Sequence, residues 1–110
     1  MKLWKLVACV PLVLAGGMAQ AAPDAAEVQE ILKKNACLAC HAVDKKILGP
    51  AYREIADKHK DDANAADVLT QHVRDGSVGV WGQVPMPPNP AISDEDLAKV
   101  VEWVLAGAPD

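Results

Sequence analysis

The sequence predicts an all-α fold with four helices in a single domain. Apolar residues recur at spacings of three and four in four separate stretches of the 110-residue chain, and this is the period of an amphipathic helix. No stretch of convincing length alternates apolar and polar residues, so no strand is expected. Residues 77–92 contain four prolines and two glycines, which exclude a helix and indicate a long loop.

The first 21 residues have the pattern of a secretory signal peptide. Lys2 and Lys5 give a positive start, residues 6–15 form an apolar run, and a small-x-small triplet ends at Ala21. The apolar run is about ten residues long, whereas a membrane-spanning helix needs roughly 20. We therefore expect export and cleavage near Ala21, with no stable membrane insertion afterwards.

Cleavage would leave residues 22–110 as one domain, of a size at which the hydrophobic core is thin. A small domain of this kind usually needs an additional stabilising element. All 15 acidic residues follow the cut but two of the 11 basic ones precede it, so the mature domain is more acidic than the formal charge of −4. This charge argues against a nucleic-acid partner.

Two helices are expected in the first half of the domain. Asp24 can cap the first, Glu27 completes a capping-box pattern, and the apolar face continues to about Asn35. A Gly-Pro pair at positions 49 and 50 interrupts the chain, and a short amphipathic helix is then expected over residues 51–59.

Two more helices are expected in the second half. The third runs from about residue 63 to Asp75, where Gly76 is suited to a left-handed C-terminal cap. Ser93 caps the fourth helix, which has three acidic residues in its first turn and ends at Gly107. Helices near both ends of the domain can pack against each other.

The sequence NACLACH brings together Cys37, Cys40 and His41. On one helical turn, residues at i, i+3 and i+4 project from the same side, so two sulfurs and one nitrogen would face one ligand. C-x-x-C-H is the attachment signature of c-type haem, with two thioethers and a histidine bound to iron. A large flat apolar cofactor would also supply the missing interior of a chain without phenylalanine.

Three other interpretations of these residues are weaker. A zinc site would need about four ligands, and the mature chain offers no third cysteine. A thioredoxin-type redox pair usually follows a strand, and none is expected before Cys37. A plain disulfide would suit an oxidising compartment but would leave His41 without a role.

The second axial position of a haem decides whether the iron can react with small molecules. Met86 is the only methionine beyond the signal peptide, and it lies between two prolines that restrict the loop. We expect it to be the sixth ligand rather than a core residue. His59 lies among charged residues and is expected at the surface, whereas His72 could face the cofactor edge or border the core.

Three blocks of the sequence together resemble the small bacterial class I cytochromes c of the c-551/c-552 group. They are CLACHAVDKKILGPAYREIA, DGSVGVWGQVPMPPN and AISDEDLAKVVEWVLA, and they extend over nearly the whole mature chain. The resemblance implies a four-helix cytochrome c fold around one covalently bound haem. It also implies attachment at Cys37 and Cys40 and iron ligation by His41 and Met86.

The resemblance further implies roles for four residues around the haem. The carbonyl of Pro50 would accept the imidazole N–H of the ligand histidine, which fixes its tautomer. Trp81 matches a tryptophan whose indole reaches a propionate, and Asn89 matches an asparagine near the methionine sulfur. Relatives often have arginine at the position of His72, so a titrating histidine there would change how the potential depends on pH.

These features predict a periplasmic one-electron carrier, not an enzyme, that works as a monomer. The resemblance makes nitrite reductase the leading acceptor, with a peroxidase or terminal oxidase as other choices and a membrane quinol-oxidising complex as donor. The alternative is a haem-based peroxidase or gas sensor whose sixth ligand is displaceable. Four lysines flank the haem segment and could form a positive docking rim: Lys33, Lys34, Lys45 and Lys46.

Overall fold

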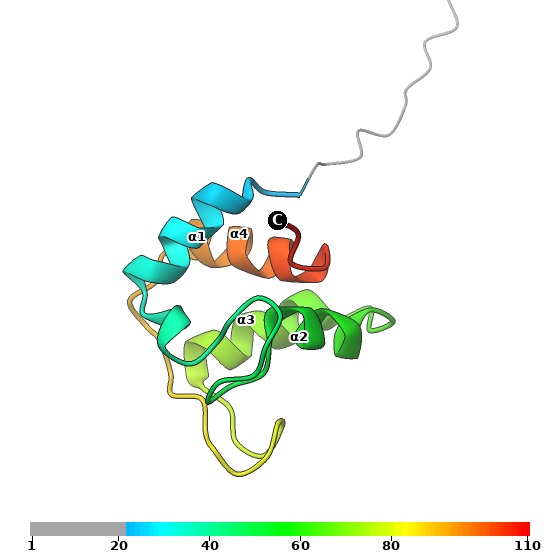
Figure 1. The fold of residues 1–110 in the computed structure, drawn as a ribbon. Helices are drawn as coiled ribbons and strands as arrows, with labels where there is room; N and C mark the ends of the chain where they lie inside the picture. The colour runs from blue at the N-terminus through cyan, green and yellow to red at the C-terminus, as the bar shows by residue number, and fades with distance from the viewer. Residues whose placement is uncertain (1–21) are drawn as a thin grey trace, which may run out of the picture.

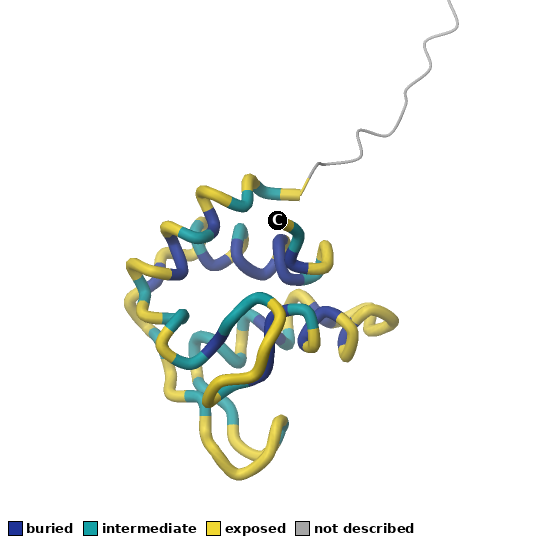
Figure 2. Tube along the Cα trace, viewed as in Figure 1, coloured by how far each residue is buried: buried dark blue, intermediate teal, exposed yellow. Residues whose placement is uncertain are grey.

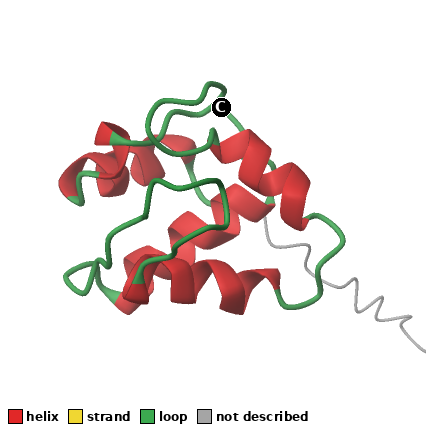
Figure 3. Ribbon diagram, turned by 90° about the horizontal axis from the view of Figure 1, so that it is seen from below, coloured by secondary structure: helices red, strands yellow, loops and turns green. Residues whose placement is uncertain are grey.

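A computed structural model describes residues 22–110 (Figure 1), and the expected signal peptide lies outside these residues. In chain order the elements are α1 (Ala25–Lys34), the 3₁₀ turn η1 (Cys37–Ala39), α2 (Tyr52–His59), α3 (Ala65–Asp75) and α4 (Asp94–Leu105). Over this part of the chain Figure 3 shows helices and loops without a strand. The prediction of an all-α fold is confirmed. None of the described helices is long and apolar enough to cross a membrane.

The N-terminus of α1 is capped as expected, but the capping box is not formed. The Asp24 carboxylate accepts a hydrogen bond from the Ala26 N–H at 2.9 Å. Within residues 22–110, Glu27 does not bond back to Asp24 but accepts from Lys99 Nζ at 2.6 Å. Because Lys99 lies on α4, the glutamate joins α1 to α4 instead of closing its own helix end.

The ends of α3 differ in detail from the predicted ones. Asp62 accepts from the Asn64 N–H at 2.8 Å, and this turn delays the start of the helix to Ala65. Gly76 ends the helix with φ 77° and ψ 176°, so its φ is positive but its ψ is extended. This conformation is essentially restricted to glycine. The chain therefore leaves α3 in an extended conformation at Gly76. The expected left-handed cap would have had a helical ψ angle instead.

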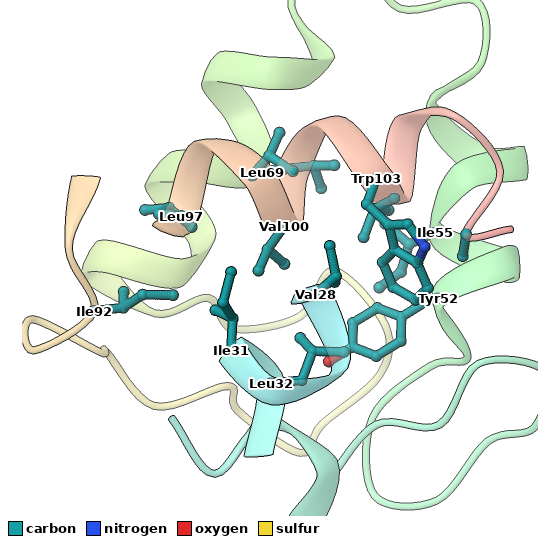
Figure 4. Packing of buried hydrophobic residues seen from close by; sticks show 13 residues of the cluster. Val28, Ile31, Leu32, Tyr52, Ile55, Leu69, Ile92, Leu97, Val100 and Trp103 are labelled. Atoms are coloured by element: carbon teal, nitrogen blue, oxygen red, sulfur yellow. The ribbon is translucent and has the colours of Figure 1, made fainter. Parts of the chain in front are cut away.

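The hydrophobic core is built around α4, which packs against α1, α2 and α3. Figure 4 shows side chains of these helices meeting between the ribbons. The largest fully buried side chains are Val28, Leu32, Leu97 and Trp103. Each such side chain contributes about 1.5–3 kcal/mol when it leaves water. The expected packing of the first helix against the last is confirmed.

Two long loops connect the helices on the side of the motif residues. The histidine loop, residues 40–51, connects η1 to α2, and the methionine loop, residues 76–93, connects α3 to α4. In Figure 1 part of the methionine loop, drawn in yellow, extends away from the helices. Figure 2 shows this part as exposed, while the inner faces of α1 and α4 are buried. Residues 44–48 of the histidine loop are exposed as well, whereas its ends at His41 and Pro50 are buried.

Candidate functional site

A cavity of ≈ 420 Å³ lies between the two loops and the helices. Apolar side chains of α2, α3 and α4, among them Ile55, Leu69 and Val100, form part of its wall. Ligand pockets of small molecules have volumes of about this size. The cavity is also lined by every residue that the sequence analysis selected: Cys37, Cys40, His41, Pro50, His72, Trp81, Met86 and Asn89.

The two cysteines lie on one tight turn at the cavity wall. The turn is a 3₁₀ turn and not a full α-helical one, but the His41 N–H still donates to the Cys37 carbonyl at 3.0 Å. Both thiols are free. The pKa of the Cys37 thiol is raised, mainly by burial and to a smaller extent by the neighbouring Cys40. Among residues 22–110 no three His, Cys, Asp or Glu side chains are grouped to hold a metal ion.

His41 is buried and held from two sides. Its Nδ1 lies 2.7 Å from the Pro50 carbonyl oxygen. A carbonyl can only accept, so Nδ1 carries the proton and Nε2 has its lone pair free to bind a metal. A Cβ on Gly49 would lie 2.6 Å from His41 Cε1, so only glycine leaves room for the ring. The Gly49 N–H donates to the Cys40 carbonyl at 2.8 Å, which fixes this close approach.

A row of aromatic rings in contact continues from His41 into the core. The Tyr52 ring lies 5.1 Å from the imidazole and 5.4 Å from the Trp103 ring. Burial is the largest cause that raises the pKa of Tyr52, so its phenol stays protonated. His41 therefore contacts Tyr52, which in turn contacts Trp103, a fully buried side chain of α4.

Met86 is half-buried and is held mainly through its backbone. It exchanges two hydrogen bonds with Ser77: Ser77 N–H to Met86 O at 3.0 Å and Met86 N–H to Ser77 O at 2.9 Å. A Cβ on Gly76 would lie 2.5 Å from the Met86 carbonyl oxygen. Glycine at position 76 is thus required both by its φ and by this contact.

Asn89 fastens the loop beyond Met86. Its N–H donates to the Val73 carbonyl at 2.8 Å, and its side-chain oxygen accepts from the N–H groups of Ala91 and Ile92 at 3.1 and 3.3 Å. Its side-chain nitrogen lies 3.5 Å from the Asn35 carbonyl at the end of α1. This amide therefore links the methionine loop to the segment that precedes Cys37.

Trp81 lies at the rim of the cavity and is 36% exposed. The ammonium group of Lys58, on α2, is 4.5 Å from the centre of the indole ring, a distance typical of a cation–π contact. The same group donates to the Val80 carbonyl at 3.3 Å. Lys58 thus holds Val80 and Trp81 of the methionine loop against α2.

The two histidines outside the motif occupy different places. His72 is among the residues that line the cavity. The expectation that His59 is a surface residue is wrong: it is only 8% exposed. It lies on the same face of α2 as Tyr52 and Ile55, and its Nδ1 is 3.7 Å from Asp62. It is not among the residues that line the cavity.

The sequence analysis missed three residues that act on the site. Gly49 makes room for the histidine ring, Lys58 holds the rim, and Arg74 contacts the methionine loop and Asp94. Only Gly49 was marked by a local sequence pattern, because the Gly-Pro pair at positions 49 and 50 interrupts the helical pattern. The contacts of Lys58 and Arg74 join residues 15 to 22 positions apart, which no short sequence pattern reveals.

Comparisons with known proteins agree with this geometry. The sequence profile of the cytochrome c family matches residues 25–108. Cytochrome c-552 of Nitrosomonas europaea is 46% identical over 93 residues, which cover 84% of each chain. Cytochrome c-551 of Pseudomonas aeruginosa is 46% identical over 95 residues, which cover 86% of this chain and 90% of that one.

Solved structures give the same result for the fold. The crystal structure of wild-type Nitrosomonas europaea cytochrome c552 matches with a TM-score of 0.69 and 46% identity, over 72% of this chain and 98% of that one. The class 1 cytochrome MtoD from Sideroxydans lithotrophicus ES-1 matches with a TM-score of 0.65 and 28% identity, over 77% of this chain and 97% of that one.

The chain therefore belongs to the cytochrome c family. It is a small class I cytochrome c, an electron carrier rather than an enzyme, with a covalently attached c-type haem. The lining of the cavity fits a covalently attached haem. It includes the thiols of Cys37 and Cys40, the imidazole of His41 with its free Nε2, and the thioether of Met86, and Gly49 leaves space for the His41 ring.

Proposed function

We propose that the chain is a periplasmic one-electron carrier in which Cys37 and Cys40 form the thioether bonds and His41 and Met86 are the axial ligands of the iron. The observation that carries this proposal is that all four side chains line one cavity, although they come from segments nearly 50 residues apart. When bound, the haem supplies an iron that takes up one electron and releases one.

The protein residues would hold both ligands in place through this cycle. The Pro50 carbonyl fixes the tautomer of His41 and makes Nε2 the better donor. The Ser77 backbone pair holds Met86 at the wall. If His41 and Met86 both hold the iron, no coordination site would be left open to a substrate, which is the condition for electron transfer without catalysis.

The proposed location rests on the N-terminal sequence. Residues 1–21 have the charge and apolar pattern of an export signal, so we propose that residues 22–110 are the mature periplasmic protein. The acceptor we propose is a terminal reductase such as nitrite reductase, with a peroxidase or terminal oxidase as other acceptors. The donor would be a membrane quinol-oxidising complex.

The proposed docking surface is an apolar rim around the mouth of the cavity. Leu48, Trp81 and Val84 are exposed hydrophobic side chains that line the cavity. Ile47 and Val78 are further exposed hydrophobic side chains of the same two loops. Lys45 and Lys46 lie exposed beside the histidine-loop part of this rim. Electron-transfer partners meet through small interfaces of this kind, in which charge steers the approach.

The ligand assignment is tested with the exported, haem-loaded protein. We expect the ferric wild type to show the near-infrared charge-transfer band of histidine–methionine ligation, and Met86→Ala to lose it. We also expect the reduced wild type to add carbon monoxide slowly and Met86→Ala to add it fast. A band that persists in Met86→Ala would refute the methionine assignment, and rapid carbon monoxide binding by the wild type would favour the gas-sensing alternative.

A further inference from the structure

We propose that Arg74 is a positioning residue for Met86, because it clamps the second half of the methionine loop to the end of α3. This inference rests on the proposed role of Met86 as an axial ligand. It adds a determinant of how firmly that ligand is held. The clamp would act on the backbone of residues 89–92 and not on the methionine side chain itself.

The guanidinium group of Arg74 reaches three backbone carbonyls and one carboxylate. Its Nη1 lies 3.4 Å from the carbonyl oxygens of both Asn89 and Pro90, and it also donates to the Ile92 carbonyl. Its Nη2 donates to the Asp94 carboxylate at 2.5 Å, at the first turn of α4. Arg74 is half-buried and permanently charged, and hydrogen bonds from a charged donor are stronger than neutral ones.

The proline content of the loop explains why a side chain has to supply these donors. Residues 85–90 contain four prolines, and a proline has no N–H to offer to a neighbouring carbonyl. The contacts to the Asn89 and Ile92 carbonyls are part-buried, and a backbone carbonyl that is withdrawn from water still needs a partner. Arginine presents five N–H groups in a planar fork and can serve several acceptors at once, whereas lysine is a single point charge.

The methionine loop is attached on both sides of the Met86 side chain: by the backbone bonds to Ser77 and by the Arg74 clamp on residues 89–92. On one side the backbone of Met86 is bonded to Ser77, and on the other Asn89 is bonded to Val73, next to Arg74. Pro87 and Pro88 between them have fixed φ angles. Withdrawal of Met86 from the cavity therefore requires that at least one of these attachments opens. Loss of Arg74 would make the opening at residues 89–92 easier.

The experiment uses the haem-loaded protein and imidazole as a competing ligand for the ferric iron. We expect Arg74→Gln to bind imidazole about tenfold more tightly than the wild type, as expected for the loss of a hydrogen bond from a charged group. Arg74→Lys should give a smaller gain. In the same variants the Asn89 amide should exchange its hydrogen faster, while the Gly49 amide should be unchanged.

Two controls separate the clamp from general effects. Arg53→Gln removes an arginine that pairs with Asp110 at 3.1 Å and touches no carbonyl of the methionine loop. Val28→Ala weakens the α1–α4 core at a fully buried position that is not part of the cavity wall. Both controls should bind imidazole as the wild type does.

Each outcome decides the question. Unchanged imidazole binding in Arg74→Gln would overturn the clamp, and so would an equal gain in Val28→Ala. If Arg74→Gln yields no haem-loaded protein, unchanged binding in Arg74→Lys would overturn it as well. A wild type without the histidine–methionine charge-transfer band would instead overturn the ligand assignment, and the clamp with it, before any Arg74 variant is compared.

Discussion

The histidine loop and the methionine loop line the same cavity but are held in different ways. His41 is buried, bonded to Pro50, and packed against Gly49 and Tyr52 inside the fold. Met86 is half-buried and depends on a pair of backbone bonds to Ser77. The comparison predicts that, if His41 and Met86 are the iron ligands as proposed, ligand exchange would begin on the methionine side.

The attachments of the two loops also differ in their distance from the core. The histidine loop continues directly into α2, where the Tyr52 N–H donates to the Ala42 carbonyl at 2.9 Å. The tip of the methionine loop, by contrast, is fixed to α2 by the single side chain of Lys58. Val78 and Val84 near that tip are 78% and 64% exposed. Both ends of the histidine loop therefore join buried parts of the fold, although residues 44–48 between them are exposed. The methionine loop is held by backbone bonds at Ser77, Met86 and Asn89, and its tip by the Lys58 side chain.

The largest expected effect comes from Gly49→Ala. The new methyl group would lie 2.6 Å from His41 Cε1 and would force the ring away from the Pro50 carbonyl. Overpacking of this kind costs about 3 kcal/mol, so the free energy of unfolding should fall by that amount in urea titrations. Gly79→Ala is the control for a loop glycine: nothing lies within 4 Å of its added Cβ, so it should lose only the smaller cost of alanine at φ 78°. Equal loss in both variants would show that the histidine side is not specially packed.

Gly76→Ala should have the next largest effect and should act on the other side. Its φ of 77° is unfavourable for alanine, and the added Cβ would lie 2.5 Å from the Met86 carbonyl. We expect a loss of about 2 kcal/mol in the free energy of unfolding. The methionine charge-transfer band should weaken while histidine ligation remains. Loss of the histidine ligand instead would contradict the proposed difference between the loops.

Lys58→Gln tests the attachment of the loop tip. It removes the cation–π contact with Trp81 and weakens the bond to Val80. At an exposed site such a contact contributes about 0.5–1 kcal/mol. Stability should change little, but hydrogen exchange at residues 78–84 should become faster, with Lys60→Gln as the neighbouring control. Identical exchange in both variants would mean that Lys58 does not restrain the tip.

Lys99→Met should have the smallest effect, because it lies away from both loops. The hydrogen bond to Glu27 is the main cause that raises the pKa of Lys99 above its ordinary value of 10.5. A raised pKa stabilises the fold fully below 10.5, and this contribution is lost as the pH rises through the folded-state value. The variant should therefore melt slightly below the wild type at neutral pH, and the difference should shrink in strong alkali. A difference that grows with pH would contradict the assignment.

Much of the fold and of the cavity wall followed from local patterns. The helix faces, the caps at Asp24 and Ser93, and the C-x-x-C-H segment depend on residues within a few positions of one another. Met86 could be singled out because residues 22–110 contain no other methionine. These features needed no knowledge of how distant segments meet.

The misses have two physical causes. The positions of Arg74 and Glu27 depend on partners far along the chain, so Glu27 pairs with Lys99 and not with its own helix end. His59 was misjudged from its charged neighbours, although its position four residues after Ile55 already put it on the buried face of α2. Helical spacing, and not the polarity of adjacent residues, was the correct guide there.

Amide hydrogen exchange of the haem-loaded wild type tests the difference between the loops most directly. The reporters are the Gly49 and Tyr52 N–H groups on the histidine side and the Ser77, Met86 and Asn89 N–H groups on the methionine side, each with a backbone carbonyl as its acceptor. We predict that the methionine-side amides exchange through a partial opening that leaves the histidine side protected. Equal protection on both sides, or faster exchange at Gly49 than at Met86, would contradict the account.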